Sequence, residues 1–146
     1  MSSEQMNKAR RILLKISGEA LSGEGGFGID PQVLSNTAKA IRNVQNQGVQ
    51  TVLVIGGGNI FRGAALQKAG FDRVAGDQMG MLATIMNGLA MREELKAQGG
   101  HCVLMSAYGI PSMTTQYSAT LGRELLDQGH SLIVAGGTGA PFFTTD

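Results

Sequence analysis

Three consecutive glycines, Gly56 to Gly58, follow an apolar, β-branched run and come shortly before Arg62. Glycine lets a ligand approach the main chain closely, and consecutive N–H groups at a strand-to-helix turn can bind an anion. The guanidinium of an arginine adds a planar fork that suits phosphate oxygens. These residue types therefore indicate phosphate binding, although a tight turn that happens to use glycine is the simpler alternative.

Known phosphate-loop patterns match this stretch only in part. Gly58 and Gly63 have the spacing of a Walker loop, but Ala64 and Ala65 stand where Lys and Ser or Thr belong. The dinucleotide fingerprint also fails, because Phe61 occupies the position of its third glycine. If this loop handles phosphate, its lysine must come from elsewhere in the chain.

Lys15 and Asp77 are two further candidates, and each has an ordinary structural alternative. Lys15 lies inside the apolar run 12–16, where an ammonium without a partner is costly to bury. It is either an edge-strand lysine that reaches back to water or a group at the strand's carboxyl end that faces phosphates. Asp77 is either the N-cap of a long helix over about 77–98 or a ligand contact.

The elements that must position these residues alternate between strands and helices. The predicted strands are continuously apolar, and they span residues 12–16, 51–55, 102–105 and 131–135. The predicted helices span about 31–48, a short piece within 59–68, about 77–98 and about 117–129. The Gly-rich segment 21–29 is predicted to be a mobile surface loop.

This alternation predicts an α/β fold with a mostly parallel sheet covered by helices on both faces, joined by right-handed crossovers. Ligands of such sheets bind beyond the carboxyl ends of the strands. Lys15, the segment from Gly56 to Arg62 and the segment from Gly136 to Asp146 all fall at that edge. The sequence therefore predicts one site there, built from three loops.

Composition excludes several other classes of function. A length of 146 residues suits one domain, and a net charge of +1 without a basic run argues against nucleic-acid binding. The polar segment 1–11 is not a signal peptide, and no apolar run approaches membrane length. Cys102 is the single cysteine and reads as a buried structural thiol, which fits a reducing, cytoplasmic setting. His101 and His130 lack partners at metal-ligand spacing, so no metal site is predicted.

Four motifs in order give the chain a specific resemblance. They are Lys15-Ile16-Ser17-Gly18-Glu19-Ala20-Leu21, the stretch from Gly56 to Gly63, the stretch from Gly76 to Thr84, and the stretch from Gly137 to Asp146. From about Arg11 to its last residue the chain resembles the bacterial uridylate kinases, which have the amino-acid kinase fold. The resemblance implies an enzyme of pyrimidine nucleotide biosynthesis that transfers the γ-phosphoryl group of ATP to UMP with Mg²⁺, giving UDP. It also implies a homohexamer that GTP activates and UTP inhibits.

The resemblance also assigns roles by position. Lys15 matches the lysine that neutralises the transferring phosphoryl group, and Asp146 matches an acidic residue that orients the catalytic lysines. The positions on the ATP and phosphate side are Lys15, Ile16, Ser17, Gly18, Gly58 and Arg62. The positions around UMP are Gly57, Asp77, Thr138, Gly139, Ala140, Pro141, Phe142, Phe143, Thr144 and Thr145. The region implicated in GTP activation comprises Gly23, Glu24, Gly25, Gly26, Phe27 and Gly28.

Two departures from the family pattern affect what is expected. Family members usually carry Asn at the position of Ala140, so one polar contact to UMP is expected to be absent or replaced. Family chains continue well past the position of Asp146 and gain there an ATP-binding lobe and a further catalytic lysine. We therefore expect residues 1–10 to be a flexible lead-in and residues 11–146 to be the N-terminal, UMP-binding part of the domain. By itself such a chain is expected to bind UMP weakly without turnover.

Two alternative functions remain open from the sequence. A kinase of the same fold could act on an amino-acid carboxylate, although the Asp77 segment and the segment from Thr138 to Thr145 argue against it. A catalytically silent module that senses UMP or UTP is the alternative from another class.

Overall fold

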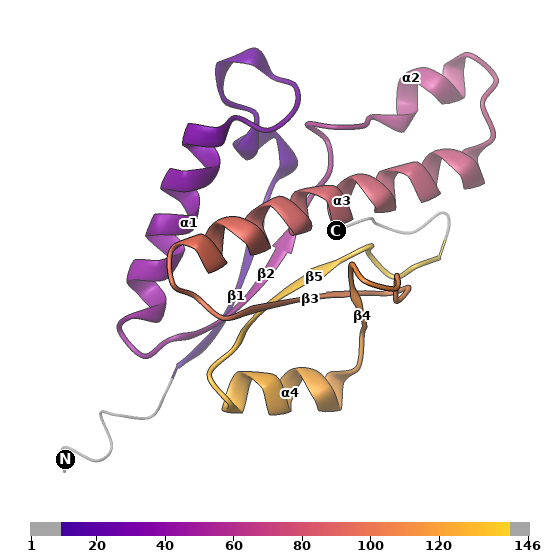
Figure 1. Ribbon diagram of the computed structural model, residues 1–146. Coiled ribbons are helices and arrows are strands. Elements are labelled where there is room, and N and C mark those ends of the chain that lie inside the picture. The colour runs from indigo at the N-terminus through magenta and orange to yellow at the C-terminus, as the bar shows by residue number, and fades with distance from the viewer. Residues whose placement is uncertain (1–9, 141–146) are drawn as a thin grey trace, which may run out of the picture.

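Five strands form one sheet in the computed structural model, which describes residues 10–140 (Figure 1). The strands are β1 (Arg11–Ile16), β2 (Gln50–Ile55), β3 (Cys102–Ser106), β4 (Thr115–Gln116) and β5 (Ser131–Ala135). Their order is β1-β2-β5-β3-β4, and each of the four neighbouring pairs is parallel. The predicted α/β class with a mostly parallel sheet is confirmed.

Helices lie on both faces of this sheet, as predicted. Helices α1 (Pro31–Gln45) and α3 (Arg73–Ala97) cover one face, and α4 (Ala119–Asp127) lies on the other (Figure 1). Because side chains alternate along a strand, the adjacent residues Leu132 and Ile133 enter different hydrophobic clusters. The larger cluster lies beneath α1 and α3, so that face contains the main core. None of the described helices is both long enough and apolar enough to cross a membrane.

Helix α1 begins where its capping signal predicts. The side chain of Asp30 accepts hydrogen bonds from the N–H groups of Gln32 (2.9 Å) and Val33 (3.0 Å), and Pro31 occupies the first helical position. The helix ends at Gln45, just before the predicted stop. A short helix, α2 (Gly63–Lys68), also forms within the predicted range 59–68.

Helix α3 begins earlier than predicted, which corrects the N-cap reading of Asp77. The N-cap is Asp72, whose side chain accepts a 3.3 Å hydrogen bond from the N–H of Ala75. Asp77 therefore lies inside the helix and cannot cap it. The first turn shows little apolar periodicity, so the capping aspartate rather than the hydrophobic pattern marks the start of the helix.

Two segments are more regular than the sequence suggested. The segment 21–29, predicted as a surface loop, follows directly on the 3₁₀ helix Gly18–Leu21, contains a second 3₁₀ helix, Gly23–Gly25, and buries Leu21 completely. Residues 23–27 are exposed, as predicted for a surface segment, and Phe27 is 77% exposed. The second segment is β4, which was not predicted because two residues are too short to show a strand period.

Candidate phosphate-binding site

The carboxyl ends of β1 and β2 meet at a cavity of about 310 Å³. Lys15 is paired with Val54 and Ile16 with Ile55, so both strands end at the same level. The segments that follow them therefore leave the sheet side by side. The cavity is lined from the end of β1, the glycine loop and helix α3 by Lys15, Ser17, Gly18, Glu19, Gly56, Gly57, Gly58, Phe61 and Gly80.

Lys15 is exposed at this edge, and β1 is the outermost strand of the sheet. Its ammonium is therefore not a buried charge within the apolar run. Exposure on an edge strand agrees with the structural alternative, and a place on the cavity wall agrees with the functional one. The structure thus brings the lysine to the loop whose phosphate-binding pattern lacked one.

The glycine loop has backbone donors free for a ligand. The N–H of Gly56 donates to the carbonyl of Ile16 at 2.9 Å and so continues the sheet. Among residues 10–140, the next three N–H groups, those of Gly57, Gly58 and Asn59, have no hydrogen-bond acceptor. Successive unpaired N–H groups in a turn attract an anion. Gly57 and Gly58 also line the cavity, so an anion there can reach both Lys15 and backbone donors.

Close packing gives two of the site glycines a second reason to be glycine. A Cβ at Gly57 would lie 2.8 Å from the Cβ of Ala83 on α3. A Cβ at Gly18 would lie 2.5 Å from the side-chain oxygen of Asn59. The glycines are therefore required by the packing of the loop against its neighbours whatever ligand it binds, which sequence reasoning did not detect.

Arg62 lies beside the loop and is held by two contacts. Its Nη2 donates to Oε1 of Glu19 at 2.6 Å, and its Nε donates to the carbonyl of Gly58 at 3.2 Å. The Arg62 and Glu19 side chains are 69% and 49% exposed, so water screens the ion pair. Arg62 is thus positioned at the rim of the cavity, with an acidic neighbour that the sequence analysis did not single out.

Helix α3 ties both glycine-rich loops to the core through two side chains one turn apart. Asn87 donates from Nδ2 to the carbonyl of Gly56 at 2.7 Å. Thr84 accepts at Oγ1 a 2.8 Å hydrogen bond from the N–H of Gly136. Sequence reasoning missed both residues. Gly88, next to Asn87, marks the close packing of this part of α3 on the sheet, since a Cβ there would lie 2.7 Å from Cδ1 of Leu104 on β3.

Other predicted site residues lie apart from this cavity. Asp77 forms an ion pair with Arg73 at 3.7 Å and is not among the described residues that line the cavity. Thr138 borders a different cavity of about 730 Å³ on the α4 face, and its Oγ1 accepts a 3.2 Å hydrogen bond from the N–H of Ala140. The carbonyl of Gly139 accepts a hydrogen bond from the hydroxyl of Tyr108.

The remaining expected site residues either lie near the cavity without lining it or lie outside the described residues. Ile16 ends β1 beside the cavity without lining it. The segment from Gly23 to Gly28 is joined to the glycine loop through Asn59. The UMP positions Pro141, Phe142, Phe143, Thr144 and Thr145, and the catalytic position Asp146, lie outside the described residues.

Cysteine and histidine chemistry is also distant from the cavity. Burial raises the pKa of the Cys102 thiol from 9.0 to about 11, so the thiol stays protonated and is a poor nucleophile. His101 and His130 lie near each other, with ring centroids 6.0 Å apart. Among residues 10–140, no three His, Cys, Asp or Glu side chains are grouped in a way that could hold a metal ion.

Comparison with known proteins identifies the family. A sequence model described as the amino acid kinase family matches residues 10–146. The uridylate kinase of Saccharophagus degradans is 55% identical over 139 residues, which are 95% of this chain and 56% of that protein. The uridylate kinase of Psychromonas ingrahamii is 54% identical over 146 residues, which are 100% of this chain and 59% of that protein. The chain belongs to the amino acid kinase family.

Solved structures agree with this assignment. The UMP kinase from Bacillus anthracis superposes with a TM-score of 0.88 at 35% identity, covering 93% of this chain and 56% of that one. The UMP kinase from Ureaplasma parvum gives a TM-score of 0.87 at 33% identity, covering 94% of this chain and 58% of that one. The chain thus spans between half and two thirds of the length of the relatives that it matches.

Proposed function

We propose that residues 11–146 form the UMP-binding part of an enzyme that transfers the γ-phosphoryl group of ATP to UMP, with residues 1–10 as a lead-in. The observation that carries the proposal is the shared cavity, in which Lys15 faces a glycine loop with unpaired N–H groups. The names of relatives at 54–55% identity supply the substrate class. Further support comes from the solved UMP kinases of the same fold.

The chemistry suits such a cavity. Phosphoryl transfer needs positioning and neutralisation of the charge on the equatorial oxygens, with little covalent help from the protein. The Lys15 ammonium supplies a positive charge, and the N–H groups of Gly57 and Gly58 supply fixed dipoles. Arg62, positioned by Glu19, adds a second cation at the rim. Catalytic roles for Lys15 and Asp146 are part of this proposal.

Mg²⁺ fits the site as a companion of the nucleotide phosphates. Magnesium is commonly held by one or two carboxylates together with substrate phosphates. Glu19 is the carboxylate among the described residues that line the cavity, so it is the protein group that would face the ion. When bound with ATP, the ion would neutralise charge on the phosphate oxygens.

UMP recognition is assigned to Asp77 on α3 and to the segment that follows β5. Asp77 would hold the ribose, and the segment from Thr138 to Thr145 would surround uridine and its phosphate. Thr138 and Ala140 follow β5 at the carboxyl edge of the sheet, where ligands of parallel sheets bind. Ala140 has no side-chain hydrogen-bonding group, so UMP is expected to lose one contact here that an Asn would make.

Binding of UMP tests the substrate. Isothermal titration of the 146-residue chain with UMP, uridine, CMP and N-acetylglutamate should give binding to UMP and at least about tenfold weaker binding to uridine, because charged hydrogen bonds to phosphate are among the strong ones. The matched variants are Lys15→Ala, which should weaken UMP binding little, and Gly57→Ala, which should weaken it strongly. Preference for N-acetylglutamate would overturn the proposal in favour of a carboxylate kinase.

Turnover tests the reaction itself. The 146-residue chain should release no ADP in a coupled assay with ATP and UMP. A chimera that joins it to the remaining part of the Saccharophagus degradans relative should release ADP, and Lys15→Ala in the chimera should lower kcat far more than UMP affinity. UMP or UTP binding without turnover in the chimera would instead favour a nucleotide-sensing module.

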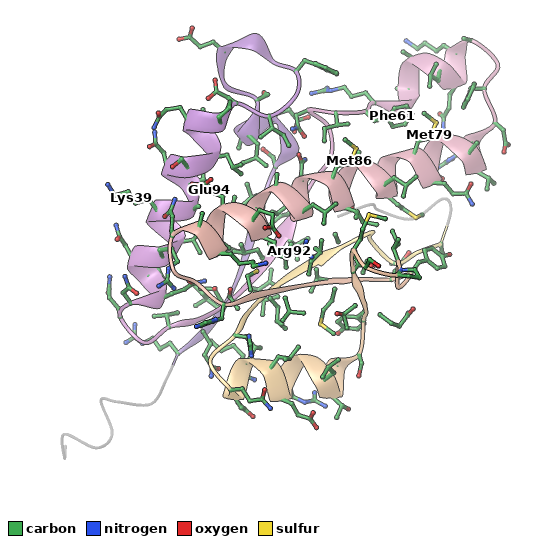
Figure 2. All side chains as sticks on the ribbon, in the orientation of Figure 1. Lys39, Phe61, Met79, Met86, Arg92 and Glu94 are labelled. Atoms are coloured by element: carbon green, nitrogen blue, oxygen red, sulfur yellow. The ribbon has the colours of Figure 1, made fainter. Side chains whose placement is uncertain are left out.

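Assembly and regulation complete the proposal: a cytoplasmic homohexamer in pyrimidine biosynthesis, activated by GTP through Gly23–Gly28 and inhibited by UTP. A subunit contact has support from α3, where Met79, Leu82 and Met86 are 39%, 53% and 52% exposed. Met79 and Met86 lie along this helix in Figure 2. Sedimentation of wild type and Leu82→Lys tests the contact: the wild type should sediment as an oligomer and the variant as smaller species.

A further inference from the structure

Two buried asparagines, Asn59 and Asn87, face each other behind the glycine loop. They are 1% and 0% exposed. Asn87 donates from Nδ2 to Oδ1 of Asn59 at 2.7 Å, and Asn59 donates from Nδ2 to Oδ1 of Asn87 at 3.1 Å. Buried amides are costly unless their polar groups are paired, so this reciprocal pair stabilises one fixed arrangement.

Each amide uses its remaining N–H on a different loop. Asn87 donates to the carbonyl of Gly56 at 2.7 Å, and Asn59 donates to the carbonyl of Gly28 at 2.8 Å. All four side-chain N–H groups of the pair are thus engaged. Rotation of either amide by 180° would place its oxygen against a backbone carbonyl, so the network itself fixes both orientations.

Asn59 forms hydrogen bonds with both the carbonyl and the N–H of Gly28. Besides the side-chain bond to the carbonyl, the carbonyl of Asn59 accepts a 2.7 Å hydrogen bond from the N–H of Gly28. Gly28 adopts a positive φ of 74°, and its segment ends at the exposed tip around Phe27. An unbroken series of four groups therefore leads from this tip to the phosphate loop: Gly28, Asn59, Asn87 and Gly56.

We infer that Asn59 and Asn87 are positioning residues that couple the segment from Gly23 to Gly28 to the glycine loop. A displacement of Gly28 must break or move the hydrogen bonds of Asn59, and with them the Asn87 contact that fixes Gly56. The unpaired N–H groups of Gly57 and Gly58 then change direction, and the affinity for an anion changes. The ligand-affinity part of the inference rests on the proposed function, whereas the mechanical coupling does not.

A double-mutant cycle on the 146-residue chain tests the coupling. Gly28→Ala perturbs one end, because an alanine resists the positive φ, and Asn87→Ala removes the link. UMP affinity by titration calorimetry and amide hydrogen exchange at Gly56 and Ile60, the hydrogen-bonded N–H groups that flank the unpaired ones, are measured for the wild type, each single variant and the double variant. Gly28→Ala should weaken binding and speed exchange in the wild-type background but have little further effect beside Asn87→Ala. The departure from multiplicative effects should be about threefold or more.

The matched control is Met91→Ala, one turn further along α3. Met91 is also fully buried, but it packs in the hydrophobic core cluster. Combined with Gly28→Ala, it should give multiplicative effects on affinity even though it destabilises the fold. Thermal unfolding identifies variants that fold, and if Asn87→Ala does not, Asn59→Ser takes its place, because a hydroxyl cannot reproduce both amide bonds.

The outcomes separate the inference from the proposed function. Multiplicative effects of Gly28→Ala and Asn87→Ala, with unchanged exchange at Gly56 and Ile60, would overturn the coupling even when the wild type binds UMP. If the wild type binds no UMP, the proposed substrate fails, and the exchange measurements alone decide the coupling. Non-multiplicative behaviour of the Met91→Ala control would also overturn it, by showing general loosening of the core.

Discussion

The two faces of the sheet differ in how completely they are packed. On the α1 and α3 face, Leu53 is fully buried within the larger hydrophobic cluster. On the α4 face, Leu13 is 65% exposed and borders the cavity of about 730 Å³. Leu53 lies on the inner strand β2 beneath α1 and α3, whereas Leu13 lies on the outermost strand β1 and faces the α4 side. Their difference in burial therefore comes from their places in the sheet and not from their residue type.

This difference extends to the candidate site. The glycine loop is fastened to α3, the helix of the well-packed face, through Asn87 and through the close contact of Gly57 with Ala83. The segment containing Thr138 borders the open cavity of the other face. The glycine loop is therefore positioned by the well-packed core, whereas the proposed UMP segment begins where packing is sparse. Substitutions on the α3 face should therefore displace the glycine loop far more than substitutions on the α4 face.

Substitution of the two leucines should give the largest contrast. Leu53→Ala removes a fully buried side chain and should lower the free energy of unfolding by about 2–5 kcal/mol, from lost burial and the cavity left behind. Leu13→Ala removes a side chain that is mostly in water and should change it by less than about 1 kcal/mol. Urea denaturation followed by circular dichroism measures both. Equal losses would show that the α4 face is as well packed as the other.

Gly57→Ala should have the next largest effect, because the loop meets α3 too closely for a Cβ. The added atom would lie 2.8 Å from the Cβ of Ala83, which should cost about 1–3 kcal/mol of stability and displace the N–H groups of the loop. Gly76→Ala is the matched control within α3, where a Cβ meets nothing within 4 Å, and it should stabilise the chain by about 0.5–1 kcal/mol. Unfolding curves and UMP titration of both variants test this. A Gly57→Ala variant with wild-type stability and affinity would contradict the packing argument.

Sequence patterns predicted the parallel sheet, because continuous apolar strands alternated with helices and each strand ended in glycine or polar residues. They also predicted where Lys15 and the glycine loop would meet, since parallel strands share one carboxyl edge. They failed at the start of α3, where Asp72 and not Asp77 caps the helix. Local patterns carry the periodicity of an element but only weakly mark its ends.

The contacts that position the loop could not be predicted in the same way. Asn59 and Asn87 are 28 residues apart and join only through the packing of α3 on the sheet. A polar residue within a helix is usually expected at the surface, and nothing in the local sequence distinguishes a buried Asn87 from an exposed one. Burial and partner identity are tertiary properties, so the network became visible only in the structure.

The pH dependence of stability should reveal the partial burial of Cys102, whose side chain packs against the core cluster of the α1 and α3 face. Its pKa is raised from 9.0 to about 11 in the folded chain, chiefly by burial. Below pH 9 the Cys102 thiol is protonated in both the folded and the unfolded chain, so its full contribution to stability is present. Between pH 9 and 11 the unfolded chain loses the proton first, so the free energy of unfolding falls, by about 2 kcal/mol at pH 11. Denaturation at several pH values should show this fall, and Cys102→Ala should reduce it; an identical fall in the variant would contradict the assignment.

Arg62→Ala should change stability least while changing ligand binding. The ion pair between Arg62 and Glu19 has an N–O distance of 2.6 Å and lies exposed to solvent. Such pairs contribute about 0–1 kcal/mol to the free energy of unfolding. Arg11→Ala is the matched control. Arg11 forms a similar exposed ion pair with Asp127, with an N–O distance of 2.9 Å, and neither residue lines the glycine cavity. Both variants should unfold within about 1 kcal/mol of the wild type. Only Arg62→Ala should weaken UMP binding, by about tenfold, since a charge-assisted hydrogen bond to phosphate is lost. Equal affinities of the two variants would restrict Arg62 to a role in holding Glu19 at the rim of the glycine loop.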